Sequence, residues 1–481
     1  MRTENHILLL VCIGVVSLAI ACPNSPTIAA DPAFQVPVGQ RQLFLDEFGI
    51  ATIENLERTM HSATKKGAVI RPDPNRPKGA LQIRNAPFWI AEANVFRFMI
   101  ADTAGATSTF RWFNSPDGLH WTPEAQPDMG NYMVLYHPHD PNPARRYKTV
   151  KPNHGVAVSP DGIQWSMVPG VASVPTGDEQ NLTFDEQNHI YLLTVKRGGP
   201  HGRSVGLATS EDFEHWTDHG LIFHADDRDQ ELGKRRIKAH LADPNLQQPL
   251  WNNPSVYNVD VYNMPVFRYE GCYIGMPMMY HAVGQVPDHP NTTGFHQVQV
   301  VCSRDLKTWN RVGDRKAFIK PSPKGTGAYD TLQIVPPSNA VVRDDELWFY
   351  YSGMKYRGSY GLSEAEQLKL ETHYGAINLA VLRRDGFVSL DASDKEGKIL
   401  TEPFLVPGDK LMVNVDALDG ELRAEMLDAE GTVVAKSEPL TGDLLREPVK
   451  WSEGDMAELN GQHASLRFTL RNAQFYSYWI E

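Results

Sequence analysis

Hydrophobic and polar residues alternate over short segments along most of this chain, and such period-two runs predict β-strands. Turn residues separate the runs, and the chain holds 37 Gly and 34 Pro. One stretch shows the full order: residues 182–184, a turn at 185–188, residues 190–195, a loop at 196–203, and residues 205–209. We therefore predict an all-β fold whose units contain four strands each.

A seven-residue signature, Ser-x-Asp-x-x-x-Trp, recurs along the chain and is typical of a tight turn. Its Ser and Asp side chains hydrogen-bond their own backbone, and its Trp begins the next strand as a large packing group. The copies are Ser115–Trp121, Ser159–Trp165, Ser210–Trp216 and Ser303–Trp309, with a degenerate fifth at Arg383–Gly386. Regular repeats of four strands predict a five-bladed β-propeller over residues 40–395. The long interval 210–303 has room for a sixth blade.

The pattern changes near residue 390 to a run of short alternating segments. We interpret residues 398–481 as a small C-terminal β-sandwich. Before the first blade, Gln42–Asp46 has the pattern of a strand, and we expect it to pair with the last blade and close the ring.

A second motif, Asp-x-x-Asn/Gln, precedes four of the hydrophobic runs. Successive strands run in opposite directions, so every second connection emerges on the same face. The long insertions all fall in connections of one such set and therefore gather on one face, which in repeat proteins is usually the binding face. The motif enters the innermost strands from that same face. Its copies are Asp128 with Asn131, Asp178 with Asn181, Asp260 with Asn263, and Asp330 with Gln333.

These residues suit the hydrolysis of a glycosidic bond, which needs two carboxyl groups on opposite sides of the bond. Our candidate catalytic residues are Asp178 as base and Asp260 or Asp330 as acid or as the group that tunes the acid. Further candidates for substrate binding are Asp128, Asn131, Glu179, Asn181, Asn263 and Gln333. The same Asp-x-x-Asn spacing also caps the entry of a strand, so a purely structural use of the motif stays open.

Cations and aromatic side chains complete the candidate site. The cations are Arg84, Lys196 and Arg357. They either pair with the ring of Asp residues that the motif supplies or recognise a carboxylate or sulfate on an anionic glycan. Tyr262 is a candidate for stacking on a sugar ring. No His or Cys pair has zinc spacing, and we expect no cofactor, although a central calcium would fit a propeller axis.

The net charge of −12 argues against a nucleic-acid partner, because such partners require a basic face. Residues 1–30 are typical of an export signal. Cleavage after Ala21 would leave Cys22 as a lipid-anchored N-terminus, and cleavage after Ala30 would not. No later segment is long enough to span a membrane. We expect a periplasmic or extracellular protein in which Cys272 and Cys302 either form a disulfide or remain free.

The chain resembles the five-bladed propeller superfamily of glycoside hydrolases, families 43 and 32, which includes arabinanases, xylosidases and invertases. Within it the chain is similar to exported planctomycete-type members. The similarity is carried by Leu43–Asp46, the Ser-Pro-Asp-Gly-x-x-Trp turns, Thr176–Asp178, Tyr269–Gly271 and Tyr350–Gly353. It implies an acid and a base on separate blades. The sucrose-cleaving motifs Asn-Asp-Pro-Asn-Gly, Arg-Asp-Pro and Glu-Cys-Pro are absent from the sequence, so the resemblance implies no sucrose or fructan substrate.

Two hypotheses follow from the sequence. In the first, the protein is an exported glycoside hydrolase that acts on a poly- or oligosaccharide. In the second, it is a propeller that only binds glycans or another protein, and salt bridges to Arg84, Lys196 or Arg357 occupy the Asp residues. The fold alone does not separate them.

Overall fold

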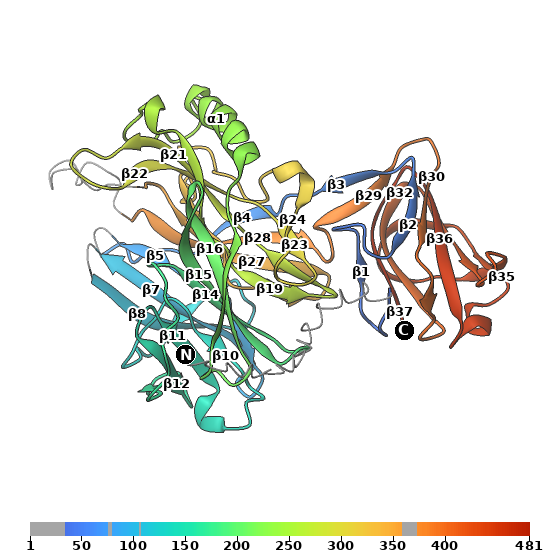
Figure 1. The fold of residues 1–481 in the computed structure, drawn as a ribbon, viewed down its shortest axis with the longest axis horizontal. Helices are drawn as coiled ribbons and strands as arrows, with labels where there is room; N and C mark the ends of the chain where they lie inside the picture. Colours follow the sequence, from blue (N-terminus) through green and yellow to red (C-terminus); the bar gives the residue numbers. More distant parts are fainter. Residues whose placement is uncertain (1–33, 76–78, 105–106, 358–372) are drawn as a thin grey trace, which may run out of the picture.

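The computed structural model describes residues 34–75, 79–104, 107–357 and 373–481, and its regular secondary structure is almost entirely β-strand (Figure 1). Within these ranges the one α-helix is α1 (Asp227–Ala242), and short 3-10 turns lie at Pro143–Arg145, Pro254–Val256, Val312–Arg315 and Met456–Leu459. The predicted all-β class is confirmed. No helix of the described ranges has the length and apolar character needed to cross a membrane. The expected export signal and Cys22 lie outside these ranges.

Five antiparallel units follow one another along the chain, as the repeat predicts. Unit 1 contains β5 (Ala80–Gln82), β6 (Phe88–Ile90), β7 (Val95–Ala104), β8 (Thr107–Ser115) and β9 (Thr122–Pro123). Unit 2 contains β10 (Leu135–Tyr136), β11 (Tyr147–Lys151), β12 (Gly155–Ser159) and β13 (Ser166–Met167). Unit 3 contains β14 (Gln180–Asp185), β15 (Ile190–Gly199), β16 (Gly202–Ser210) and β17 (Thr217–Phe223).

Units 4 and 5 depart from the simple four-strand pattern. Unit 4 contains β18 (Asn258–Asn263), β19 (Val266–Tyr269), β20 (Cys272–Gly275), β21 (Met278–Gln285), β22 (Thr292–Val298), β23 (Val301–Ser303) and β24 (Asn310–Arg311). Its inner strands break at Pro265 and Pro277, because proline has no N–H to give to a ladder. Unit 5 contains β25 (Gln333–Val335), β26 (Val341–Arg343), β27 (Glu346–Met354) and β28 (Gly375–Arg383). The interval 210–303, which the structure describes throughout, holds β17 of unit 3, α1 and the divided strands of unit 4, and no sixth unit.

Each unit packs against the next, and the last returns to the first. Strand β10 packs on β14, β16 on β18, and β22 on β25. Units 5 and 1 meet through Gly375 and Ala80, which pair across β28 and β5. Units 1 and 2 meet where the Arg84 N–H donates to the Tyr132 carbonyl oxygen. This closed order of five units agrees with the predicted five-bladed propeller, although units 5 and 1 share one ten-stranded sheet.

The strand that completes the last blade is not the one predicted. Strand β4 (Thr64–Ile70) pairs with β28, whereas β1 (Gln42–Leu43) pairs with β37 (Ala473–Ile480) in the C-terminal sheet. The prediction that Gln42–Asp46 closes the ring is therefore wrong. The physical reason is that an alternating run fits any free sheet edge, and its pattern does not specify which one.

The C-terminal body is one twelve-stranded sheet that also takes in the N-terminal strands (Figure 1). The predicted end of the propeller at 395 falls between β29 and β30, and the predicted start of the sandwich at 398 falls within β30. Both strands belong to this sheet, and the division into domains stays a prediction. Its strands besides β1 and β37 are β2 (Ile50–Glu54), β3 (Glu57–Met60), β29 (Val388–Ala392), β30 (Gly397–Thr401), β31 (Phe404–Leu405), β32 (Leu411–Leu427), β33 (Val433–Ser437), β34 (Leu440–Pro448), β35 (Trp451–Glu453) and β36 (His463–Arg471).

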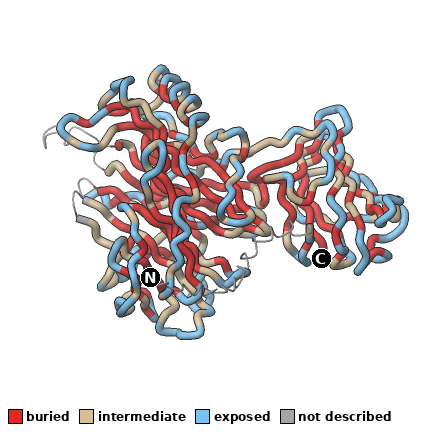
Figure 2. Tube along the Cα trace, viewed as in Figure 1, coloured by how far each residue is buried: buried red, intermediate tan, exposed pale blue. Residues whose placement is uncertain are grey.

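Buried residues run through the middle of both bodies and across the junction between them (Figure 2). At this junction the Asp385 carboxylate accepts hydrogen bonds from Arg41 Nη1 at 2.6 Å, Tyr269 Oη at 2.6 Å and Ser477 Oγ at 2.6 Å. The Asn414 amide donates to it at 3.3 Å. One buried carboxylate therefore ties the end of a propeller strand to the C-terminal sheet.

The two cysteines of the described residues lie close to this junction. Cys272 and Cys302 are buried and free, so of the two states left open by the sequence the structure has the reduced one. Cys272 belongs to β20 and Cys302 to β23, which are paired strands of unit 4.

The recurring signature forms the predicted turn between the third and fourth strands of its blades. In unit 2, Asp161 Oδ1 accepts from the backbone N–H groups of Ile163 at 2.8 Å and Gln164 at 2.9 Å. The Gly162 N–H donates to Ser159 Oγ, and Gly162 has φ +77°. The Trp165 indole N–H closes the turn on the Gly162 carbonyl oxygen. These local hydrogen bonds explain why the element can be recognised from seven residues.

Asp161→Ala is expected to lower the free energy of unfolding by about 1–2 kcal/mol, since two backbone N–H groups lose their acceptor. Burial raises the pKa of Asp161, but the backbone hydrogen bonds outweigh this and lower it. The contribution is therefore present above the unfolded pKa and is lost as the pH falls through the folded pKa. Urea unfolding at several pH values measures this. An equal difference between variant and parent at every pH would contradict the turn's assigned role.

Candidate functional site

The predicted motifs of units 3, 4 and 5 lie at the entry ends of inner strands. Asp178 precedes β14, Asp260 lies within β18, and Asp330 precedes β25. In unit 3, the first residue of β14, Gln180, pairs with Val195 of β15. Strand β15 continues beyond Val195 into its hairpin with β16, so this hairpin turns at the end where β14 begins. We call this end of the propeller, with the side chains described below, the mouth.

An amide and ion-pair network crosses the mouth between three blades. Arg84 donates to Glu179 through Nε at 2.5 Å and Nη2 at 2.7 Å. The Asn263 amide donates to Glu179 Oε2 at 3.2 Å and accepts from the Asn181 amide. Burial lowers the pKa of Arg84, but the Glu179 carboxylate outweighs this and raises it. Four of the predicted residues are thus brought together.

Asp178 stands at the rim of the mouth, paired with Lys196. The distance from Lys196 Nζ to Asp178 Oδ1 is 2.5 Å, and the Asp178 side chain is 73% exposed. Desolvation raises the pKa of Asp178, but the Lys196 ammonium outweighs it and holds the pKa below its usual value. Burial lowers the pKa of Lys196 itself. Asp178 is therefore an accessible carboxylate whose ionised form Lys196 stabilises.

Asp260 lies deeper, and its environment acts in the opposite direction. Arg203 Nε donates to its Oδ2 at 2.8 Å, while its Oδ1 has no hydrogen-bond partner among the described residues. The Asp260 side chain is 7% exposed. Burial raises the pKa of Asp260 despite the Arg203 guanidinium. Burial thus makes this carboxyl a weaker acid than a free aspartate, and one of its two buried oxygens lacks a hydrogen-bond partner among the described residues.

Two tyrosines of unit 4 form the wall beside Asp260. Lys196 Nζ lies 3.8 Å from the Tyr262 ring centroid, and the Arg203 and Arg357 guanidinium carbons lie 5.0 Å and 4.9 Å from it. Tyr280 lies beside Arg203 and Arg357 at 4.6 Å and 5.3 Å. The predicted residues Lys196, Arg357 and Tyr262 are thus placed together with the two carboxyl groups.

The remaining predicted residues are engaged elsewhere in their blades. The Asp330 carboxylate accepts from Lys65 Nζ at 2.6 Å and from Tyr351 Oη at 2.8 Å. Asp128 accepts from the Trp165 backbone N–H at 3.1 Å. These contacts do not join the network of Arg84 and Glu179.

The two amides that follow these aspartates are also buried within their own units. The Asn131 amide donates to Thr149 Oγ1 at 2.8 Å and to the Val150 carbonyl oxygen at 2.7 Å. Gln333 is buried at the start of β25. The structural use of the motif, which the sequence left open, therefore describes Asp128 and Asn131 best.

Lys65 and His296 were not among the sequence candidates. Lys65 belongs to the closing strand β4, and its partner Asp330 is 265 positions away. The His296 ring lies 4.8 Å from that of Tyr280, and burial lowers the pKa of His296 well below its usual value. No local spacing marks either residue.

Among the described residues, the His, Cys, Asp and Glu side chains that gather closely enough to hold a metal are Asp46, Cys272 and Cys302. Arg304 already binds both carboxylate oxygens of Asp46 at 3.0 Å, which opposes a cation there. A central calcium stays a prediction.

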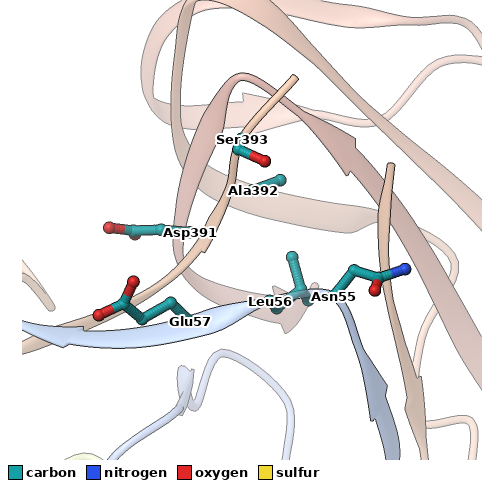
Figure 3. Close-up of a pocket in the computed structure, with 6 residues that line it drawn as sticks. All are labelled: Asn55, Leu56, Glu57, Asp391, Ala392 and Ser393. Atoms are coloured by element: carbon teal, nitrogen blue, oxygen red, sulfur yellow. The ribbon is translucent and has the colours of Figure 1, made fainter. Parts of the chain in front are cut away.

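A separate pocket lies at the edge of the C-terminal sheet (Figure 3). It contains none of the predicted residues and is lined by Asn55, Leu56, Glu57, Asp391, Ala392 and Ser393. The candidate site therefore rests on the side chains of the mouth and not on this pocket.

No family model matches the chain, and no curated protein matches it. Solved structures similar to it include one titled glycoside hydrolase, with 11% identity, TM-score 0.41, and coverage of 67% of this chain and 92% of that one. A Bombyx mori GH32 beta-fructofuranosidase has 10% identity, TM-score 0.38, and coverage of 86% and 93%. A family 43 arabinoxylan arabinofuranohydrolase from Bacillus subtilis has 10% identity, TM-score 0.36, and coverage of 86% and 99%. Similarity at this level assigns no activity.

Proposed function

We propose that the mouth binds a carbohydrate and hydrolyses a glycosidic bond, with Asp260 as the acid and Asp178 as the base. The observation that supports this most is the pair of carboxyl groups on consecutive blades whose pKa values are shifted in opposite directions. Such divergence separates an acid from a base in carboxylate enzymes. Lys196 acts on both groups, since it pairs with Asp178 and its charge lowers the pKa of Asp260.

In the proposed step, protonated Asp260 donates its proton to the glycosidic oxygen as the bond to the anomeric carbon breaks. Asp178 accepts a proton from a water molecule, whose oxygen bonds to the same carbon. The products are two sugars with free hydroxyl groups. Asp260 is left ionised beside Arg203, and exchange of protons with solvent restores both carboxyl groups.

Buried acceptor atoms support a sugar as the ligand. Besides Asp260 Oδ1, the amide oxygens of Asn85 and Asn181 have no hydrogen-bond partner among the described residues. Sugar hydroxyl groups donate hydrogen bonds to such oxygens, and leaving them unpaired is unfavourable.

A non-catalytic glycan-binding or protein-binding propeller is the second candidate. It is favoured by the ion pairs of Glu179 with Arg84 and of Asp330 with Lys65, which occupy two carboxylates of the ring. Hydrolysis of a panel of aryl glycosides and plant and marine polysaccharides separates the two. Release of reducing sugar supports the first candidate, and binding without release supports the second.

The activity is expected to follow a bell-shaped pH profile. It falls at low pH as Asp178 becomes protonated and at high pH as Asp260 loses its proton. Asp178→Asn should remove the acidic limb from the residual activity, and Asp260→Asn the alkaline limb. Initial rates across the pH range measure this; a profile unchanged in shape in both variants would contradict the assignment.

We also propose that the protein is exported, with either a free N-terminus or a lipid anchor at Cys22. The sequence of residues 1–30 supports this. Fractionation of cells that produce the parent chain and Cys22→Ser tests it: membrane association that is lost in the variant supports the anchor.

A further inference from the structure

Five exposed lysines follow one another along the flank of units 4 and 5. Two of them lie on the second half of α1, and three lie on the segment between the 3-10 turn Val312–Arg315 and β25. Within the part of the chain that the structure describes, none of the five forms an ion pair. We call them the lysine strip; they are Lys234, Lys238, Lys316, Lys320 and Lys324.

Two hydrogen bonds fasten the segment of the strip alongside α1. Arg236 Nη2 donates to the Arg315 carbonyl oxygen at 2.6 Å. The Lys324 N–H donates to the carbonyl oxygen of Asn245, just beyond the end of the helix, at 2.8 Å. The segment therefore runs beside the last turns of α1, and the lysines of both elements lie on neighbouring parts of the surface.

The charge of this region is opposite in sign to that of the whole chain. Residues 226–245 and 311–324 contain ten Lys and Arg and six Asp and Glu, whereas the chain has a net charge of −12. Three of the six acids are already paired with arginines: Asp226 with Arg315, Asp229 with Arg311 and Arg315, and Glu231 with Arg228 and Arg235. The other three, Asp227, Asp243 and Asp314, are fewer than the five lysines, and Arg236 adds a sixth cation. The excess of positive charge therefore remains after every acid of both elements is counted.

Both elements of the strip reach the mouth. Gln230 of α1 donates to the Val259 carbonyl oxygen at 2.6 Å and accepts from the Val259 N–H at 3.0 Å, next to Asp260. The Ser322 N–H donates to the Asp330 carbonyl oxygen at 3.0 Å. Helix α1 packs on β18 and β21 at the edge of unit 4 (Figure 1). The strip thus adjoins the ends at which the inner strands of units 4 and 5 begin.

Neither the helix dipole nor a membrane surface accounts for the strip. Cations near the C-terminal end of a helix are favourable, which explains Lys238, but the lysines after residue 315 belong to no helix. A helix that lies on a membrane presents apolar residues beside its cations. In α1, Ile237 and Leu241 instead pack into the hydrophobic cluster around Phe295.

We propose that the lysine strip binds an anionic polysaccharide chain, carboxylated or sulfated, and that such a polymer is the substrate class of the mouth. The substrate class rests on the proposed function, whereas binding to the strip does not. Lysine ammonium groups are compact charges on flexible stems, so a row of them suits repeated anions along a polymer. A locally positive surface also raises the concentration of an anionic polymer beside the mouth of an otherwise acidic protein.

Two pairs of polymers test the binding. Polygalacturonate and its methyl ester differ in the carboxylate, and dextran sulfate and dextran differ in the sulfate. At low salt we expect at least one anionic polymer to bind about tenfold or more tightly than its neutral partner, with the preference falling as salt is added. Fluorescence anisotropy of labelled oligomers measures this, and the two pairs distinguish carboxylate from sulfate recognition.

A triple variant removes charge from the strip outside the helix: Lys316→Gln, Lys320→Gln and Lys324→Gln. We expect it to lose about tenfold or more of the anionic binding at an unchanged melting temperature, because these lysines are exposed and form no ion pair. The matched control makes the same change of net charge in the C-terminal body, at Lys398, Lys436 and Lys450. Equal binding of anionic and neutral polymers, a triple variant that binds as the parent does, or an equal loss in the control would overturn the inference.

Vesicles of phosphatidylglycerol and the release of reducing sugar complete the experiment. Binding to the vesicles without preference for an anionic polymer would overturn the inference and assign the strip to a membrane surface. Hydrolysis of neutral glycans alone, without anionic preference, would remove this inference and leave the proposed function. Preferential binding of an anionic polymer without hydrolysis of any glycan would support the strip and remove the enzyme.

Discussion

Asp260→Asn is expected to reduce kcat on any hydrolysed glycoside by ~10²-fold or more, because the variant has no proton to give to the leaving oxygen. The loss should be largest for poor leaving groups. An aryl glycoside with an acidic phenol needs little protonation, so its rate should fall least. Comparing kcat for a nitrophenyl glycoside and for a natural oligosaccharide measures this difference.

Asp330→Asn is the matched control for this experiment, since Asp330 has the same motif and is also buried and paired with a cation. We expect it to lower stability more than kcat. Equal loss of kcat in both variants, with equal loss of stability, would show that the Asp260 effect is structural.

Asp385→Ala is expected to destabilise the protein by about 3–5 kcal/mol, because it leaves the buried Arg41 guanidinium without its counter-charge. Three further donors, from Tyr269, Asn414 and Ser477, lose their acceptor at the same time. Thermal or urea unfolding measures the loss. We expect it to appear first at the junction between propeller and C-terminal sheet.

Asp443→Ala provides the comparison, because its ion pair with Arg383 is partly exposed and such pairs contribute about 0–1 kcal/mol. If Asp385→Ala were no more destabilising than Asp443→Ala, the buried cluster would not hold the two bodies together.

Local features were predictable from the sequence, and their long-range partners were not. The turn of Ser159 and Asp161 is made by hydrogen bonds within a few residues, so its spacing is enough to identify it. The degenerate copy at Asp385 keeps the aspartate but uses it for contacts 344 and 116 positions away. Sequence spacing identifies the turn and gives no sign of this second use.

The candidate site shows the same division. The spacing predicted that Asp178 and Asp260 both lie at the entry of inner strands; Asp178 precedes β14, whereas Asp260 lies inside β18. The motif did not show that Asp128 binds the Trp165 backbone or that Asp330 binds Lys65. Which cation faces each carboxylate depends on how neighbouring blades pack. The pattern of a single strand carries no information about that packing.

The closing strand β4 has a consequence for the order in which the molecule assembles. Units 1 to 3 draw their strands from consecutive segments, so each can form as soon as it leaves the ribosome. The last blade needs β4 from the beginning of the chain and β28 from near its end, so its sheet waits for both. Until then β4 stays unpaired, and the strands β1 to β3 wait longer still, for β37, β30 and β29.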